Sequence, residues 1–246
     1  MKADPEVQRR LLDLQARDSA LARLEHRRRT LPELAVIADA DGRLAALRDD
    51  VVRSETEVGD LDRELRRLED DVDQVRRRAD RDRQRMQAGA VPAKELESLQ
   101  HEVETLTRRQ SDLEDTELEV MERREEAESR AAAVRADVET VSATRAEAEQ
   151  ARDKAFAEID AEAAADAGVR AELAPQIPAD LLALYEKVRA ASGGVGAAML
   201  RQRRCEGCRL ELMGGELRAA QAAPPDEVLR CENCRRILVR TPESGL

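Results

Sequence analysis

The stretch Arg85-Met86-Gln87-Ala88-Gly89-Ala90-Val91-Pro92-Ala93 decides the fold of this chain, because it interrupts a long and otherwise continuous helical pattern. Gly89 suits the left-handed residue that ends many helices, and Pro92 suits the first turn of a new helix. Basic side chains just before the break favour a helix C-terminus, where the helix dipole is negative: Arg81, Arg83 and Arg85. The sequence therefore predicts the tip of a helical hairpin near residues 86–93.

Apolar residues follow a heptad pattern on both sides of this tip. Before it, they recur at alternating steps of three and four from Leu44 to Ala79, with Ser54 as the one polar interruption. Beyond it, the same steps run from Leu96 to Val141, interrupted at three polar residues: Gln110, Glu117 and Arg124. This period is that of a coiled-coil seam, so we expect two helices packed through a narrow apolar stripe that is looser at its polar positions.

The two stripes match when the chain is folded back about Gly89. Apolar residues then oppose one another in successive layers: Leu65 with Leu113, Val72 with Leu106, and Val75 with Val103. Each a position meets a d position, as in antiparallel coiled coils. We therefore favour an intramolecular hairpin over the alternative of a parallel dimer, and the oligomeric state stays open.

Composition argues against a large globular core and against a membrane protein. The 246 residues include one Phe, one Tyr and no Trp, 39% of them are charged, and the net charge is −11. No segment approaches the roughly 18 apolar residues of a membrane span, and the N-terminus has no apolar signal segment. All four cysteines lie close together near the C-terminus, unlike a disulfide framework. We expect a cytoplasmic protein with reduced cysteines.

Two Cys-x-x-Cys pairs carry the clearest chemical signal: Cys205-Glu206-Gly207-Cys208 and Cys231-Glu232-Asn233-Cys234. Two tight turns that each present two thiolates supply the ligands of a tetrahedral Zn²⁺. The alternatives are two disulfides or a thioredoxin-like redox pair, but neither a secretory signal nor a βαβ pattern accompanies the cysteines. We predict one structural zinc ion per chain, which four thiolates leave without an open coordination position: Cys205, Cys208, Cys231 and Cys234.

Prolines and glycines divide the chain into three predicted parts. Residues 1–174 form the coiled-coil hairpin, with a kink near 30–33, where Pro32 lies within the Thr30-x-x-Glu33 spacing of a capping box. Residues 175–196 form a bridging helix and a flexible joint. Residues 197–246 hold short apolar runs of strand type at 197–200, 228–229 and 236–240, separated by turns at 213–215 and 223–226, as expected for a zinc ribbon.

With these motifs in place, the chain resembles the bacterial family of C4-type zinc-ribbon proteins that have a long N-terminal coiled-coil hairpin. Besides the cysteine pairs, the resemblance rests on four segments: Arg236-Ile237-Leu238, Pro178 to Tyr185-Glu186, Lys94 to Glu104, and Leu113 to Glu122. The chain departs from the family pattern at Leu96 and Ser98, and at Arg209 and Arg235, where Gly often follows each second cysteine. The resemblance implies a mostly α fold, an antiparallel two-helix hairpin followed by a small C-terminal zinc ribbon with short β strands, and binding of nucleic acid or transcription- or secretion-related machinery.

Arginines around the cysteines are candidate contacts to phosphate groups. Residues 201–246 include nine arginines and seven acidic residues, a net charge of +2 against −13 for the rest of the chain. The candidates for nucleic-acid binding are the arginines closest to the cysteine pairs: Arg203, Arg204, Arg209, Arg235 and Arg236. The alternative is that these are solvated side chains and partners of the thiolates. The ribbon has no aromatic side chain on which single-stranded bases would stack.

The sequence therefore predicts a non-enzymatic zinc-binding adaptor whose ribbon and coiled coil bind a macromolecular partner, either a protein or RNA or DNA. It shows no catalytic triad and no dinucleotide-binding loop, so neither catalytic residues nor a small-molecule substrate are expected. The alternative is a protein scaffold whose zinc ribbon is only structural. Acidic residues beyond the tip would suit a basic partner protein: Glu95, Glu97, Glu102 and Glu104.

Overall fold

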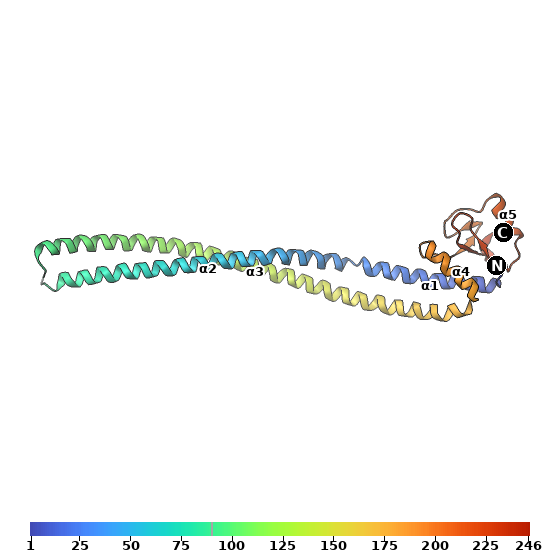
Figure 1. The fold of residues 1–246 in the computed structure, drawn as a ribbon, viewed down its shortest axis with the longest axis horizontal. Coiled ribbons are helices and arrows are strands. Elements are labelled where there is room, and N and C mark those ends of the chain that lie inside the picture. The colour runs from blue at the N-terminus through green and yellow to red at the C-terminus, as the bar shows by residue number, and fades with distance from the viewer. Residues whose placement is uncertain (90) are drawn as a thin grey trace. The chain divides into compact units, whose positions relative to one another are not determined.

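The computed structural model describes residues 1–89 and 91–246, and it confirms the predicted fold class (Figure 1). Long helices form an antiparallel hairpin, and short strands lie near the C-terminus. The helical part comprises α1 (Pro5–Arg29), α2 (Pro32–Gln87), α3 (Ala93–Leu173), the short 3-10 helix η1 (Ala174–Gln176) and α4 (Ala179–Ala191). By packing, residues 1–34 and 150–246 form one compact unit and residues 35–149 a second. The predicted division at residues 174 and 196 stays a prediction.

The tip of the hairpin joins α2 to α3 within the second unit (Figure 1). Helix α2 ends at Gln87, and Gly89 has a φ of 69°, the left-handed conformation that the sequence predicts for a helix end. The carbonyl of Pro92 accepts hydrogen bonds from the amides of Glu95 and Leu96, which begins α3. The predicted turn also includes Ala90, which lies outside the described residues.

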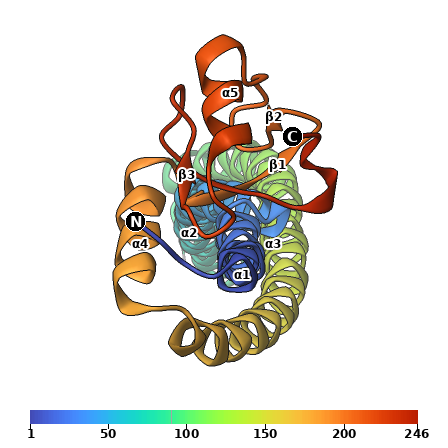
Figure 2. The ribbon, with the colours of Figure 1, turned by 90° about the vertical axis from the view of Figure 1, so that its right-hand side faces the viewer.

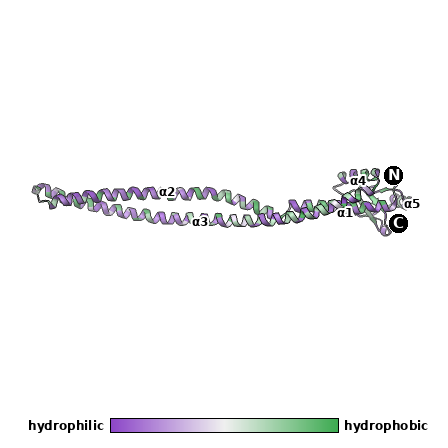
Figure 3. Cartoon of the chain, turned by 90° about the horizontal axis from the view of Figure 1, so that it is seen from below, coloured by the Kyte–Doolittle hydropathy of each residue, from purple (hydrophilic) through white to green (hydrophobic). Residues whose placement is uncertain are grey.

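The seam of the second unit is narrow and follows the predicted heptads. Two clusters of buried apolar residues lie along it, one around Leu61 and Val120 and one around Val75 and Leu106. Most residues of α2 are hydrophilic (Figure 3). Ion pairs between α2 and α3 flank the seam: Arg78 with Glu102, Arg123 with Glu64, and Arg130 with Glu57. The layer-by-layer pairing about Gly89 stays a prediction.

Two polar positions of the seam differ in how their charge is compensated. Arg124, predicted to interrupt the stripe, forms ion pairs with Asp62 and Glu128. Asp82 lies one heptad step beyond Ala79 and is 8% exposed, yet its Oδ2 atom has no hydrogen-bond partner among the residues that the structure describes. Because an unpartnered buried acceptor costs free energy, the hairpin is weakened near its tip.

The helix interruption near residue 31 has a different cap from the one expected. In place of a capping box at the start of α2, the hydroxyl of Thr30 donates a hydrogen bond back to the carbonyl of His26, at the end of α1. Helix α2 instead begins directly at Pro32, because a proline suits the first helical position, where no amide donor is needed. The two helices are therefore separated by only Thr30 and Leu31.

In the first unit, α3 packs against α1 and the start of α2 through its Ala-rich segment 151–167. Ile159 is buried with Leu24 and Leu31, and the guanidinium of Arg28 lies 4.3 Å from the centre of the Phe156 ring. These contacts hold the end of α3 beside α1.

The core of the first unit lies where α1, α4 and the sheet meet (Figure 2). Leu11 and Leu14 of α1 pack with Tyr185 of α4 and with Ile237 and Val239, which belong to a strand described below. The C-terminal part is therefore built on α1 and α4 and shares their core.

Candidate metal centre

A four-stranded sheet positions the cysteine pairs. It consists of β1 (Ala197–Arg201), β2 (Arg204–Cys205), β3 (Leu229–Arg230) and β4 (Ile237–Val239), in the order β2-β1-β4-β3. The pair β1–β4 is parallel, and the pairs β1–β2 and β3–β4 are antiparallel. Helix α5 (Gly214–Ala222) and the 3-10 helix η2 (Pro242–Ser244) complete this part. The sequence indicated β1, β3 and β4 but missed β2 and α5. It missed α5 because Gly214-Gly215 indicated a turn.

Each cysteine pair forms the same tight turn. The amide of Arg209 donates to the carbonyl of Cys205 over 2.7 Å, and the amide of Arg235 donates to the carbonyl of Cys231 over 2.8 Å. Arg209 and Arg235 close these turns with φ values of 63° and 64°. This is the left-handed conformation that explains why Gly often stands at both positions.

The structure brings the four predicted cysteines together. Their sulfur atoms all lie within 4.8 Å of one another, and the Sγ atoms of Cys205 and Cys234, like those of Cys208 and Cys231, are 3.8 Å apart. A tetrahedral ion with Zn–S bonds of about 2.3 Å places its ligands about 3.8 Å apart, whereas a disulfide requires about 2.05 Å. The four thiols therefore fit a zinc ion.

The electrostatics of the thiols also favour a bound cation. Cys205 and Cys231 are buried, and burial raises the pKa of both thiols. Amide groups of each turn partly oppose this effect, those of Cys208 and Gly207 at Cys205 and those of Cys234 and Asn233 at Cys231. Because amides alone do not offset the burial, a metal ion is the group that would make these sulfur atoms thiolates.

The five candidate arginines fall into two groups. Arg204, Arg209 and Arg235 are exposed beside the cysteine turns. The second group, Arg203 and Arg236, donates to backbone carbonyls. Arg203 donates from Nε to the carbonyl of Gly245 over 2.9 Å. The half-buried Arg236 donates to three backbone carbonyls: Ser192 over 2.7 Å, Val195 over 3.1 Å and Gly207 over 3.1 Å. The first group is available for contacts to a partner, and Arg236 is engaged inside the protein.

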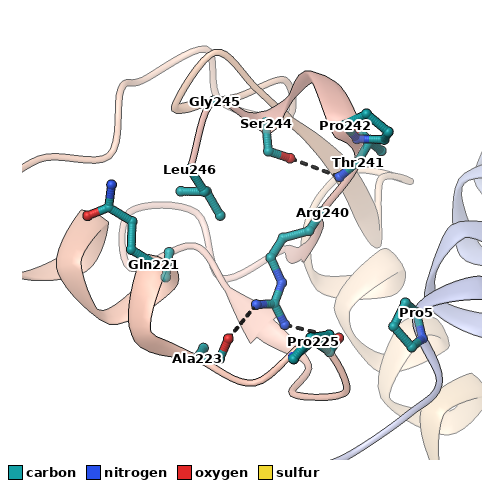
Figure 4. Close-up of a pocket in the computed structure, with 11 residues that line it drawn as sticks. Pro5, Gln221, Ala223, Pro225, Arg240, Thr241, Pro242, Ser244, Gly245 and Leu246 are labelled. Carbon is teal, nitrogen blue, oxygen red and sulfur yellow. Dashed lines mark hydrogen bonds between the residues drawn. The ribbon is translucent and has the colours of Figure 1, made fainter.

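Sequence reasoning missed Arg240 as a structural residue. Its guanidinium donates to the carbonyls of Ala223, Pro225 and Glu227 and so holds the loop between α5 and β3, at the edge of a shallow pocket that also contains Leu246 (Figure 4). The apolar residues Ile237 to Val239 indicated a strand, but they gave no indication of which carbonyl groups Arg240 contacts.

The N-terminal residues also belong to this part of the structure. The amide of Ala3 donates to the carbonyl of Asp226 over 2.7 Å, the amide of Val228 donates to the carbonyl of Met1, and Lys2 forms an ion pair with Asp226. No sequence pattern pointed to this pairing, because backbone hydrogen bonds of an extended segment leave no signature in side-chain spacing.

Comparisons with known proteins agree with this architecture. Residues 14–193 match the CT398-like coiled coil hairpin domain, and residues 204–238 match the C4-type zinc ribbon domain. An uncharacterised protein of Mycobacterium tuberculosis strain H37Rv is 41% identical over 98% of both chains. A solved structure from Mycobacterium smegmatis is 40% identical, with a TM-score of 0.85 over 98% of this chain and 100% of that one. The structure of CT398 from Chlamydia trachomatis shares the fold at 17% identity, with a TM-score of 0.68 over 96% of this chain and 98% of that one.

These matches confirm the family that the sequence resembled. They also support zinc as the metal for the four cysteines, since the ribbon match spans all four. None of the helices in the described part of the chain combines the length and the apolar composition that a membrane span requires.

Proposed function

Because the chain belongs to the family of proteins with a CT398-like coiled-coil hairpin and a C4-type zinc ribbon, we propose that it is a non-enzymatic cytoplasmic adaptor. One zinc ion per chain, held by Cys205, Cys208, Cys231 and Cys234, would stabilise the ribbon. Four thiolates fill a tetrahedral coordination sphere, so the ion has a structural role and does not activate water. The ribbon and the hairpin are the surfaces that bind macromolecular partners.

The observation that carries this proposal is the conformation of the two arginines that close the cysteine turns. Arg209 and Arg235 are exposed and left-handed, a conformation that costs a residue with a Cβ atom about 1–2 kcal/mol and costs Gly almost nothing. With arginine in place of glycine at both positions, the protein is less stable but carries two exposed guanidinium groups beside the metal centre. Together with Arg204, these side chains favour phosphate groups of RNA or DNA as the partner.

Salt-dependent binding tests this function. We expect RNA or duplex DNA to bind the zinc-loaded protein with an affinity that falls steeply with salt, because phosphate contacts release counterions. Replacing Arg204, Arg209 or Arg235 with Ala should lower the slope of log affinity against log salt by about 1 for each phosphate that the variant no longer neutralises. Arg218→Ala, which removes an exposed arginine of α5, is the matched control. Absence of binding at low salt would exclude the nucleic-acid role.

A second candidate function is a protein scaffold that acts through the hairpin. The apolar side chains of Leu118 and Met121 in α3 are 58% and 41% exposed. They lie about one helical turn apart and have acidic neighbours such as Asp115 and Glu122. An exposed apolar pair rimmed by charge is typical of a protein contact, here with a basic partner. A partner that co-purifies with the wild type and with the ribbon arginine variants, but is absent with Leu118→Ser/Met121→Ser, would favour this function.

A further inference from the structure

The segment between α4 and β1, residues 192–196, corresponds to the predicted flexible joint, but the structure holds it from two sides. On the side of α1, the Oε1 atom of Gln15 accepts hydrogen bonds from the amide of Gly196 over 2.6 Å and from the amide of Ala197 over 3.3 Å. The Nε2 atom of Gln15 donates to the carbonyl of Gly194 over 3.0 Å. Since Gln15 is only 7% exposed, these bonds are shielded from water and strengthened.

Buried neighbours fix the side chains on this side of the joint. The hydroxyl of Tyr185 donates to Asp18 over 2.6 Å, and Asp18 forms an ion pair with Arg170. Burial and then the bond to Asp18 raise the pKa of Tyr185, so its hydroxyl keeps the proton that it donates. A Cβ atom at Gly196 would lie 2.7 Å from the carbonyl oxygen of Tyr185, so only glycine permits this approach.

On the other side, Arg236 connects the joint to the first cysteine turn. Its Nη2 and Nε atoms donate to the carbonyls of Ser192 and Val195 in the joint, and its Nη1 atom donates to the carbonyl of Gly207, between Cys205 and Cys208. A Cβ atom at Gly207 would lie 2.6 Å from Cδ of Arg236, which shows how closely the side chain crosses the turn. One guanidinium therefore joins the metal-binding turn to the segment that Gln15 holds.

We propose that Arg236 couples zinc binding to the docking of the joint on α1, so that loss of the metal releases the joint from Gln15. A cysteine turn of this kind is ordered by its metal, and without the ion the carbonyl of Gly207 no longer has a fixed position. Arg236 then loses the partner that orients it toward Ser192 and Val195. The joint thus has two states, one held by Gln15 and one released from it, and the metal selects between them.

This coupling is reciprocal. If zinc favours the docked joint by some factor, docking raises the affinity for zinc by the same factor, which for couplings of this kind is about 5-fold to 150-fold. Weakening the contact at Gln15 should therefore weaken zinc binding, although Gln15 lies in α1 and is not one of the four candidate ligands.

Hydrogen exchange of the full-length protein tests the proposal directly. With zinc bound, the amides of Gly196 and Ala197 should be protected, and removal of zinc with a chelator should speed their exchange about 5-fold to 150-fold. Arg236→Gln with zinc still bound, as shown by elemental analysis, should lose the same protection, and subsequent chelation should add little. Arg218→Gln is the matched control, because the side chain of this arginine of α5 is exposed. Unchanged protection at Gly196 after chelation would overturn the proposal.

A second variant keeps the test decisive if Arg236→Gln fails to bind the metal. Gln15→Met removes the acceptor for the two amides while keeping a similar volume, and competition with a chromophoric chelator should show zinc affinity lowered about 5-fold or more. An affinity equal to that of the wild type would contradict the coupling. The proposal rests on the zinc centre proposed above, and elemental analysis of the wild type separates failure of that centre from failure of the coupling.

Discussion

Replacing Asp82 with Leu should stabilise the hairpin near its tip. Asp82 occupies a seam position of α2 and is 8% exposed, while its Oδ2 atom has no hydrogen-bond partner in the described part of the chain. Leaving such an acceptor unpaired costs about 1–3 kcal/mol, and burying a leucine side chain contributes about 1.5–3 kcal/mol. The two contributions overlap, because both describe the removal of one side chain from water, and they are therefore not added. We expect the free energy of unfolding to rise by about 2 kcal/mol.

Hydrogen exchange in residues 72–86 and 96–110 measures this gain locally, because the two packing units need not unfold together. A gain of about 2 kcal/mol corresponds to roughly 30-fold slower exchange in that region. Asp82→Asn removes the charge but keeps an amide that needs partners, so it should recover only part of the effect. Asp70→Leu places the same side chain at an exposed position of α2 and should leave exchange unchanged. Faster exchange in Asp82→Leu, with helicity retained, would refute the reasoning.

Three further predictions concern other parts of the chain. Cysteines at positions Val72 and Leu106 should cross-link within one chain, and a product formed only between chains would contradict the pairing about Gly89. Cys234→Ser should release zinc and unfold the ribbon while circular dichroism shows the hairpin still helical; a variant that keeps its metal would refute the ligand assignment. Arg240→Ala should destabilise the ribbon by about 2 kcal/mol in urea unfolding followed by ribbon-specific resonances, because the loop after α5 loses its charged hydrogen bonds. The exposed Arg218→Ala is its control, and equal stability of the two variants would count against this role.

The hairpin could be predicted because its determinants are local or periodic. The heptad steps from Leu44 to Ala79 place one side chain per turn on the same face, and Gly89 with Pro92 ends one helix and begins the next. The same pattern, extended by one step, would have found Asp82, since the position after Ala79 in the seam is residue 82. The predicted stripe stops at Ala79 because residue 82 is polar, whereas the structure keeps that residue buried.

The cysteine centre was also predictable, because each turn is formed by four consecutive residues. The Cys-x-x-Cys spacing places two sulfur atoms on one side of a tight turn. The structure brings the two turns together, so that all four sulfur atoms lie close to one another. The positive φ values of Arg209 and Arg235 follow from the same local geometry. The contacts of the arginine side chains cannot be predicted from this local geometry. A guanidinium on a long flexible stem reaches whichever acceptors the fold brings near it.

The sequence by itself therefore determined the helical hairpin, its tip and the four clustered cysteines, since periodicity and short-range spacing encode them. Only the tertiary structure decided that Arg236 turns inward to Ser192 and Gly207, and that Gln15 holds the amides of Gly196 and Ala197. These contacts join residues far apart in the chain through single side chains, and no repeat or motif marks them. Their energy depends on burial and on hydrogen-bond geometry, which exist only once α1, α4 and the sheet have packed around a common core.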